Sequence, residues 1–365
     1  MAGKVRAGII GAGFIGGVHA QAVRSTGAVI SRVADSTPET ARVAAFRLGA
    51  EAAAESAEAL IEADDVDVVH ICTPNATHVA LAELALKAGK HVVCEKPLAT
   101  SEEAARGLSE AAREAGVVAA VPFVYRYYPT VREARGRIAA ADGARLWLLH
   151  GSYLQDWLSS SNETNWRVDP ALGGGSRAFG DIGVHWCDLM EFTTGHRITR
   201  LTARFARAFA ERGSGATASS VGTEDGAAVM FETDRGATGS VVVSQVSPGR
   251  KNRLWFSFDG ADTSYVFDQE VPDSLWVGGR HENVVVPRGP DTLTSAGAAS
   301  YARLPAGHPQ GYQDSFNAFV ADVYGAISGG TPDGLPTFED GHRAAAITEA
   351  VIASAHQETW VEVAA

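Results

Sequence analysis

The stretch Gly11-Ala12-Gly13-Phe14-Ile15-Gly16 stands between an apolar run from Val5 to Ile10 and a helical pattern that continues to Ser25. It is a G-x-G-x-x-G motif with a strand before it and a helix after it, which is the context the motif needs to bind a pyrophosphate. The first glycine permits a tight turn, the second lets the main chain approach an anion, and the third lets the helix pack closely. N–H groups at the helix start face the anion. The stretch therefore predicts an α/β domain with a dinucleotide site.

A carboxylate closes the next predicted strand. Val29 to Ala34 reads as that strand, and Asp35 follows it, 19 residues after Gly16. A carboxylate at this place accepts hydrogen bonds from an adenosine ribose diol and repels a 2′-phosphate. Ser36 and Thr37 come next, with no arginine immediately behind them. The pattern predicts NAD as the cofactor in preference to NADP.

The alternation of strands and helices continues to a lysine at a strand end. Asp67 to Cys72 reads as a buried strand that ends in Thr73-Pro74-Asn75, and His91 to Cys94 as another that ends in Glu95-Lys96-Pro97. Pro97 cannot donate to a sheet ladder, so the strand stops there. Lys96 is then expected at the carboxyl edge of the sheet, where open α/β sheets bind ligands. A surface Glu-Lys pair that only closes a strand remains the alternative. Thr73, Pro74 and Asn75 are expected beside the glycine loop, close to the dinucleotide.

The pattern of predicted strands and helices changes at Pro122. Residues 1–122 read as the dinucleotide-binding α/β domain and residues 123–365 as a second, α+β domain. In the second domain longer alternating strands predominate, including a hairpin that turns near Asp234-Arg235-Gly236. They predict a large, mostly antiparallel, open-faced sheet with helices on one face. The glycine-, serine- and alanine-rich segment from Arg212 to Thr223 is expected to be a mobile loop.

Two further clusters carry polar groups suited to chemistry. In the run from Gly173 to His185, Asp181 is expected to cap a helix, and the i, i+4 spacing places His185 one turn along on the same face. A structural Asp cap with a buried histidine is the alternative. In Tyr153-Leu154-Gln155-Asp156-Trp157, Gln155 and Trp157 share a face if the segment is a strand end. Together with Tyr128 they suit a sugar ring, unless they are an exposed Gln and a core Trp of an ordinary strand.

These motifs, in this order, resemble the Gfo/Idh/MocA family of NAD(P)-dependent sugar and cyclitol oxidoreductases. The resemblance rests on GAGFIG, the acid after the second strand, CTPN, EKP, and Tyr125-Arg126 before Pro129. It implies Lys96, Asp181 and His185 as the catalytic set, which also contacts the substrate. It further implies that the cofactor is contacted by Gly11, Gly13, Phe14, Ile15, Gly16, Asp35, Thr73, Pro74, Asn75, His78, Glu95, Lys96, Trp166 and Arg167. The YLQDW and SRAFGDIGVHW segments are most similar to members that oxidise anhydrosugars or glucosides.

The predicted activity is a hydride exchange between NAD and a secondary hydroxyl of a sugar, anhydrosugar or cyclitol. His185 would accept the hydroxyl proton, Lys96 would polarise the oxygen, and Asp181 would orient and stabilise the histidine. The alternative is a non-catalytic NAD-binding sensor on the same scaffold. The presence of all three residues favours the enzyme, because a sensor needs the glycine loop without a proton relay.

Composition limits the possible partners. The chain has 31 Lys and Arg against 43 Asp and Glu, a net charge of −12, which argues against a nucleic-acid partner. No run approaches the roughly 20 apolar residues of a membrane span, and Met1 to Lys4 leaves no room for a cleavable signal, so a cytoplasmic location is expected. Three widely spaced cysteines predict buried thiols. No spacing supports a metal site. Hydrophobic strands such as Val241-Val242-Val243 predict a dimer or tetramer, with homotetramer as the expectation.

Overall fold

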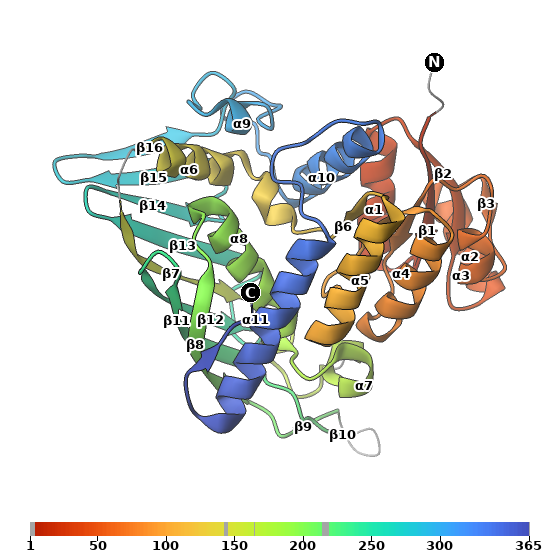
Figure 1. Cartoon of the computed structure of the whole chain (residues 1–365), viewed down its shortest axis with the longest axis horizontal. Coiled ribbons are helices and arrows are strands. Elements are labelled where there is room, and N and C mark those ends of the chain that lie inside the picture. Colours follow the sequence, from red (N-terminus) through yellow and green to blue (C-terminus); the bar gives the residue numbers. More distant parts are fainter. Residues whose placement is uncertain (1–3, 142–144, 164, 214–218, 365) are drawn as a thin grey trace. The chain divides into compact units, whose positions relative to one another are not determined.

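The computed structural model describes residues 4–141, 145–163, 165–213 and 219–364. The chain forms two compact units. The first comprises Met1–Val124 and Tyr312–His342, and the second comprises Tyr125–Gly311 and Arg343–Ala365. The sequence places Tyr312–His342 with the second domain, whereas the structure groups it with the first unit. The reason is that helix α10 (Tyr312–Ile327) packs along helix α1 (Phe14–Ser25), and Gln313 Nε2 donates to the carbonyl of Val18 at 3.2 Å (Figure 1).

The first unit is built on a parallel sheet in the order β3-β2-β1-β4-β5-β6. Every neighbouring pair in it runs parallel, which confirms the Rossmann expectation. The strands of its centre are buried on both faces, as apolar runs in parallel sheets are. The strands are β1 (Arg6–Ile10), β2 (Val29–Ala34), β3 (Ala52–Ala53), β4 (Val68–Ile71), β5 (His91–Cys94) and β6 (Ala119–Ala120).

The helices between these strands begin and end at residues that the sequence marks. Thr37, Ser56 and Ser101 each accept a hydrogen bond from a backbone N–H of the first turn, as helix N-cap residues do. Gly49 and Gly116 end two of the helices with positive φ values of 65° each. The helices are α2 (Pro38–Leu48), α3 (Ala57–Ile61), α4 (His78–Lys87) and α5 (Glu102–Ala115).

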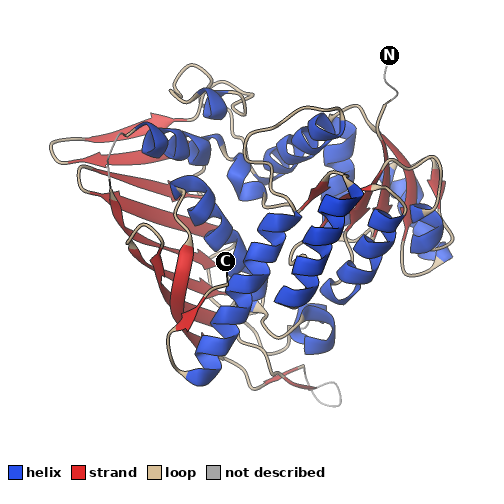
Figure 2. Ribbon diagram, in the orientation of Figure 1, coloured by secondary structure: helices blue, strands red, loops and turns tan. Residues whose placement is uncertain are grey.

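The second unit is built on a sheet of nine strands in the order β16-β15-β14-β13-β7-β12-β11-β8-β17. Strand β12 pairs parallel with β7 and the other described pairs are antiparallel, so the expectation of a mostly antiparallel sheet is confirmed. Figure 2 shows these strands in red. They are β7 (Leu146–Leu154), β8 (Ile198–Ala206), β11 (Gly226–Thr233), β12 (Thr238–Ser244), β13 (Arg253–Gly260), β14 (Thr263–Asp268), β15 (Ser274–Gly279), β16 (Asn283–Pro287) and β17 (Val361–Glu362).

Helices α6 (Pro129–Ala140) and α8 (Val184–Thr194) pack against one face of this sheet. Smaller elements are α7 (Pro170–Gly173), α9 (Ala296–Ala299) and the pair β9 (Glu211–Arg212) and β10 (Ser219–Ser220), while α11 (Phe338–Gln357) contributes residues to both units. The loop expected from Arg212 to Thr223 falls partly on residues 214–218, which lie outside the described residues. The alternation of the hairpin strands is clear: Val241 and Val243 are buried, whereas Val242 is 48% exposed.

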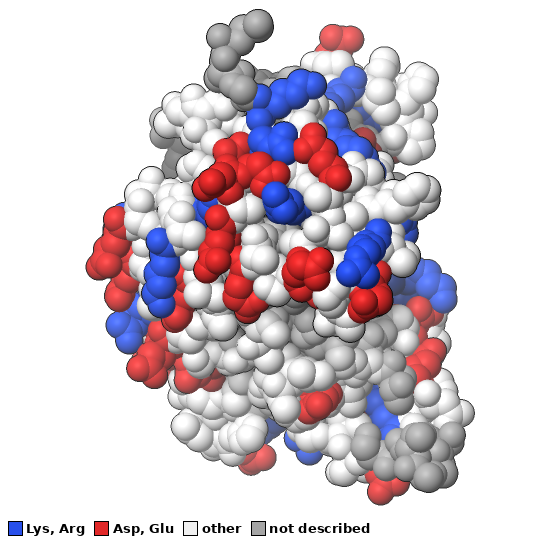
Figure 3. All heavy atoms as spheres, turned by 90° about the vertical axis from the view of Figure 1, so that its right-hand side faces the viewer, with Lys and Arg blue, Asp and Glu red and all other residues white. Residues whose placement is uncertain are grey.

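On the face of the molecule that Figure 3 shows, basic and acidic side chains are interspersed. Within the described residues, no helix is both long enough and apolar enough to cross a membrane.

Candidate active site

The glycine loop between β1 and α1 has the geometry that binds a pyrophosphate. Gly11 has φ +88°, and a Cβ there would lie 2.7 Å from the carbonyl oxygen of Cys72. A Cβ on Gly16 would lie 2.1 Å from the carbonyl oxygen of Gly11, so only glycine lets α1 pack here. At Gly13, by contrast, a Cβ would meet no atom within 4 Å. The open position is therefore the second glycine, where an anion must approach the main chain.

The surroundings of the loop fit a dinucleotide. Gly13 is the N-cap of α1 and supplies no side-chain cap. The first N–H groups of a helix have no intrahelical acceptor, and they can bind an anion. Asp35 lies directly beside the loop, because its Oδ2 accepts from Ala12 N at 3.3 Å while its Oδ1 accepts from Ser36 N at 2.7 Å. Phe14, in the first turn, is 81% exposed, and Ile15 is half-buried. Open N–H groups beside a carboxylate at the end of β2 are the donor and acceptor set that a pyrophosphate and a ribose diol require.

The segment after β4 lies at the same edge of the sheet. Thr77 Oγ1 donates to Thr73 Oγ1 at 2.6 Å and so closes the turn that holds Pro74 and Asn75. His78 is buried, with Nδ1 at 2.8 Å from the Pro97 carbonyl and Nε2 at 3.0 Å from the Thr73 carbonyl. Burial lowers the pKa of His78, so a neutral ring donates to one of these carbonyls. His78 thus ties the turn after β4 to the turn after β5.

Lys96 stands where β5 ends. Glu95 is buried and Lys96 is half-buried. The backbone N–H of Lys96 donates to Glu95 Oε2 at 3.1 Å, so the carboxylate holds the main chain of the next residue. The Lys96–Pro97 peptide bond is cis. This is the carboxyl edge that the sequence predicts for the lysine, in the unit that carries the glycine loop.

In the second unit, Asp181 does not cap a helix. It lies inside the π-helical turn Phe179–Gly183 that leads into α8, and no side chain caps that turn from within. The expected cap is wrong because Glu224, more than forty positions further along the chain, supplies it: its carboxylate accepts from Ser176 Oγ at 2.7 Å and from the backbone N–H groups of Arg177 at 3.1 Å and Phe179 at 2.9 Å. The Asp181 carboxylate makes other contacts. Its Oδ1 accepts from Arg167 Nε at 3.3 Å and its Oδ2 from Gln245 Nε2 at 2.8 Å.

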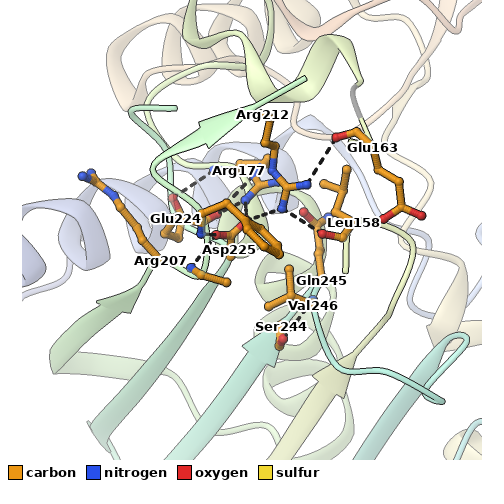
Figure 4. Close-up of polar contacts among 12 residues, drawn as sticks. Leu158, Glu163, Arg177, Arg207, Arg212, Glu224, Asp225, Ser244, Gln245 and Val246 are labelled. Atoms are coloured by element: carbon orange, nitrogen blue, oxygen red, sulfur yellow. Dashed lines mark hydrogen bonds and ion pairs between the residues drawn. The ribbon is translucent and has the colours of Figure 1, made fainter. Parts of the chain in front are cut away.

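A buried ion-pair cluster supports this turn (Figure 4). Asp225 accepts from Arg177 and, at 2.8 Å, from Arg212, and all three side chains are within 1% of complete burial. Burial opposes the charge, but the two guanidinium groups outweigh it and lower the pKa of Asp225. Arg212 also donates to the carbonyls of Ser160, Glu163 and Leu158. The cluster thereby ties the segment after β7 to the π-helical turn.

A set of hydroxyl and amide groups surrounds His185. The ring of Tyr125 lies edge-on to His185 with centroids 5.1 Å apart, and the ring of Tyr153 lies 6.3 Å away. The two phenol oxygens hydrogen bond to each other, and Tyr153 donates to Asn252 Oδ1 at 2.8 Å. Burial raises the pKa of Tyr125, which keeps it a neutral donor. This array of neutral donors and acceptors beside an imidazole is the kind that recognises hydroxyl groups.

Two of the three predicted sugar-binding residues lie with the polar set around His185, and the third lies behind it. Gln155 joins the polar set, since its Nε2 donates to Asn252 Oδ1 at 2.8 Å and its Oε1 accepts from Trp157 Nε1 at 2.7 Å. Gln155 and Trp157 therefore do lie together. Tyr128 is 1% exposed and its ring stacks on that of Tyr125 with centroids 5.9 Å apart. Tyr128 therefore packs behind the polar set.

Trp166 and Arg167 lie beside Asp181. The Arg167 guanidinium stands 4.3 Å from the centre of the Trp166 ring while its Nε reaches Asp181. The structure therefore places this predicted cofactor pair next to a predicted catalytic carboxylate, within the same unit.

Sequence reasoning missed several residues of this site, namely Tyr153, Asn252, Gln245 and Glu224. The first three have a shared signal. Strands β7 and β12 are parallel neighbours, and β13 begins where they end, so Tyr153, Gln245 and Asn252 all lie at one edge of the sheet. Polar residues at the ends of strands predicted to pair could have been grouped on this basis. Among the described residues no group of His, Cys, Asp or Glu side chains could hold a metal ion, and Cys72, Cys94 and Cys187 are buried thiols.

Comparisons with known proteins agree with this geometry. Residues 5–123 match the family model of the Gfo/Idh/MocA oxidoreductases with an NAD-binding Rossmann fold, and residues 131–266 match the Gfo/Idh/MocA C-terminal domain. The chain is 31% identical to levoglucosan dehydrogenase of Pseudarthrobacter phenanthrenivorans, covering 99% of this chain and 98% of the relative. It is 27% identical to inositol 2-dehydrogenase of Rhizobium meliloti over 99% of both. A solved structure of levoglucosan dehydrogenase in complex with NADH and L-sorbose superposes with a TM-score of 0.93 at 31% identity, covering 99% of both chains. The narrower resemblance to anhydrosugar-oxidising members is confirmed.

Proposed function

The chain belongs to the Gfo/Idh/MocA family of NAD-binding oxidoreductases, and from this premise we propose that it transfers a hydride between NAD and a secondary hydroxyl of a sugar, anhydrosugar or cyclitol. The observation that carries the proposal is the polar set around His185. Tyr125, Tyr153, Asn252 and Gln155 offer neutral donors and acceptors beside an imidazole, a composition suited to a ring that bears several hydroxyl groups. Levoglucosan and inositol, named for two relatives, are both of this substrate class.

The cofactor follows from the first unit. The glycine loop, the open start of α1 and Asp35 would hold the pyrophosphate and the adenosine ribose of NAD. NAD supplies the nicotinamide carbon that accepts or returns the hydride. Nothing in this set favours a 2′-phosphate, because the Asp35 carboxylate would repel it.

The protein's own part is to handle the proton. When a hydride leaves the carbon, the hydroxyl proton must leave the oxygen. In the proposal His185 accepts that proton and Lys96 stabilises the negative charge that develops on the oxygen. The Asp181 carboxylate orients and stabilises the histidine. Contacts from Arg167 and Gln245 fix the orientation of Asp181. The three groups are proposed to act as one unit.

Turnover measurements with single variants test the relay. Lys96→Ala and His185→Ala should each lower turnover by about 10²–10⁴-fold, the range for general acid–base groups, with NAD affinity near wild type. Asp181→Asn should be milder if the carboxylate only orients. Double variants should lose far less than the product of the single losses. Lys87→Ala and His281→Ala, at exposed positions, serve as matched controls.

Incubation of the purified protein with NAD and a panel of anhydrosugars, sugars and inositols, while the absorbance of reduced cofactor is recorded, tests the activity itself. NAD binding without reduction across the panel would favour a non-catalytic sensor instead. If Lys96→Ala and His185→Ala both keep more than about a third of wild-type activity, far outside the loss expected of proton-transfer groups, the relay is wrong.

Assembly and location complete the proposal. The uncovered side of the nine-stranded sheet bears a shallow depression lined by residues of β8, β11 and β12, among them Arg204, Met230, Ser240 and Val242. Met230 is 52% exposed, which is unusual for a large apolar side chain in the middle of a sheet. The chain is proposed to form a dimer or tetramer through this face. Buried thiols without disulfides support a reducing, cytoplasmic location.

A further inference from the structure

A continuous chain of buried hydrogen bonds runs through the first unit and ends beside Lys96. Tyr324 Oη lies 2.9 Å from His70 Nε2, His70 Nδ1 lies 2.9 Å from His19 Nδ1, and His19 Nε2 lies 3.1 Å from Glu95 Oε1. The two histidines are completely buried, and Glu95 and Tyr324 are nearly so. The sequence gives no partner to His70, because the members of this chain come from α10, β4, α1 and the end of β5.

The direction of these hydrogen bonds follows from the acceptor at the end. Both oxygens of Glu95 accept, Oε1 from His19 and Oε2 from the Lys96 backbone N–H, as an ionised carboxylate does. His19 therefore carries its hydrogen on Nε2, and its bare Nδ1 accepts from Nδ1–H of His70. Nε2 of His70 is then bare and accepts from the Tyr324 hydroxyl. In this arrangement each imidazole donates once and accepts once, so the hydrogen-bonding atoms along the chain are paired.

The same burial decides what the chain can do. Burial lowers the pKa of His70 far below its ordinary value, and burial raises that of Tyr324, with the charge of Asp67 adding to the effect. A proton moving along the chain would have to form an imidazolium at His70, which this environment strongly disfavours. This chain of hydrogen bonds is therefore suited to hold its side chains in place and not to conduct protons.

We propose that His19, His70 and Tyr324 are positioning residues that fix the Glu95 carboxylate and, through it, the main chain of Lys96. The proposal rests on the role of Lys96 in the proposed function. His19 lies on α1, the helix that starts at the glycine loop. The hydrogen bond from His19 to Glu95 thus fixes the position of the turn at Lys96 relative to α1, the helix whose start is proposed to bind the pyrophosphate. The hydrogen bond from Tyr324 to His70 is a further contact between α10 and the rest of the first unit.

Other titratable groups face Glu95 and must be considered in any pH profile. They are Cys72 at the end of β4, Cys94 on β5, His78 on α4 and Lys96 itself. Burial, with the charge of Glu95, raises the pKa of both thiols, so they stay uncharged at neutral pH. Burial lowers the pKa of His78, which stays neutral as well. Neither the two thiols nor His78 is charged at neutral pH, so a loss of kcat in a His19 variant at neutral pH is not caused by their titration.

The test compares His19→Leu, which removes the donor to Glu95, with His19→Gln, which retains a side-chain N–H of similar reach. Because the Glu95 carboxylate then loses the donor that orients it, kcat should fall while KM and the Kd for NAD stay near wild type. We expect kcat to fall by about 10-fold, the lower end of what loss of an orienting partner costs at metal sites. His19→Gln should recover most of this loss. Tyr324→Phe should lower kcat by a smaller factor.

His196→Leu is the matched control, because His196 is a buried histidine of the second unit that hydrogen bonds Thr233 Oγ1 at 2.9 Å. It should lower the melting temperature without changing kcat. If His19→Leu also lowers only stability and keeps the wild-type kcat, the positioning role is overturned.

A second readout does not depend on activity. In protein with ¹⁵N-labelled histidine, NMR should find the hydrogen of His19 on Nε2 and the hydrogen of His70 on Nδ1. The opposite tautomers, or an imidazolium at His70, would overturn the assigned direction. A protein that shows these tautomers but reduces no cofactor with any substrate would refute the proposed function and leave the hydrogen-bond chain established.

Discussion

Replacement of Gly13 by alanine should weaken NAD binding without harming the fold. The backbone of Gly13 has φ −67°, which alanine adopts freely, and the new Cβ would meet no protein atom within 4 Å. Alanine is a poorer residue than glycine before a helix, and the expected cost in unfolding free energy is below about 1 kcal/mol. The methyl group would nevertheless occupy the place where the pyrophosphate must approach the main chain.

The size of the loss follows from the hydrogen bonds at stake. A hydrogen bond to a charged group contributes about 1.5–3 kcal/mol. Displacing the pyrophosphate from one such N–H should raise the Kd for NAD by about 10- to 150-fold, at about 1.4 kcal/mol for each factor of ten. Fluorescence titration of NAD measures the Kd, and thermal denaturation measures the stability of the same preparation.

Two other glycines give the experiment its contrast. Gly16→Ala would place a Cβ 2.1 Å from the Gly11 carbonyl oxygen, so this variant should lose stability by about 1–3 kcal/mol through overpacking. Gly107→Ala lies in the exposed interior of α5, where a Cβ meets nothing, and should stabilise by about 0.5–1 kcal/mol with unchanged NAD affinity. A Gly13→Ala protein that binds NAD as tightly as wild type would show that the pyrophosphate does not lie against this glycine.

Three further outcomes are expected. The specificity constant should favour NAD over NADP by at least about tenfold because of the Asp35 carboxylate, and equal use of NADP in steady-state kinetics would refute this. Light scattering at micromolar concentration should give a dimer or tetramer mass that Met230→Asp with Val242→Asp reduces, whereas a monomeric wild type contradicts the proposed interface. Asp225→Asn should lower the unfolding free energy at pH 7 by about 3–5 kcal/mol, as breakage of a buried ion pair does. Because the pKa of Asp225 is lowered in the fold, its contribution is present above the unfolded value of about 3.9 and is lost as pH falls through the folded value. Chemical denaturation from pH 7 to 3 should show this acid-dependent loss in the wild type and a weaker one in the variant.

Local signals in the sequence predicted the first unit well. The glycine loop and the strand that ends at Asp35 depend on residues close together in the chain, and the structure has both at the predicted residues. The alternation of buried and exposed residues likewise revealed the hairpin of β11 and β12. These features follow from backbone geometry and hydrophobic period alone.

Distant contacts decided what local signals could not. A cap is normally sought within a few residues of a helix start, so Asp181 was the natural candidate, yet Glu224 fills that role from the segment before β11. Similarly, β12 pairs parallel with β7 and β13 pairs antiparallel with it, and these two pairings bring Gln245 and Asn252 to the edge that holds Gln155. Polar residues past strand ends look like ordinary loop residues until the strand order is known.

The same reasoning applies to His70, whose hydrogen-bond partners in the polar network are distant in the sequence. A buried imidazole must find a donor and an acceptor, since an unsatisfied buried polar group costs about 1–3 kcal/mol. Its partners could not be inferred from spacing, because Tyr324 is 254 positions away and His19 is 51 positions away in the sequence. The requirement itself, however, is visible in the sequence. A histidine in the middle of the apolar run Val68–Ile71 implies polar partners from elements that cover the strand, and α1 and α10 supply them. Such a residue therefore indicates a polar network in advance of any structure, even where the network's members cannot be named.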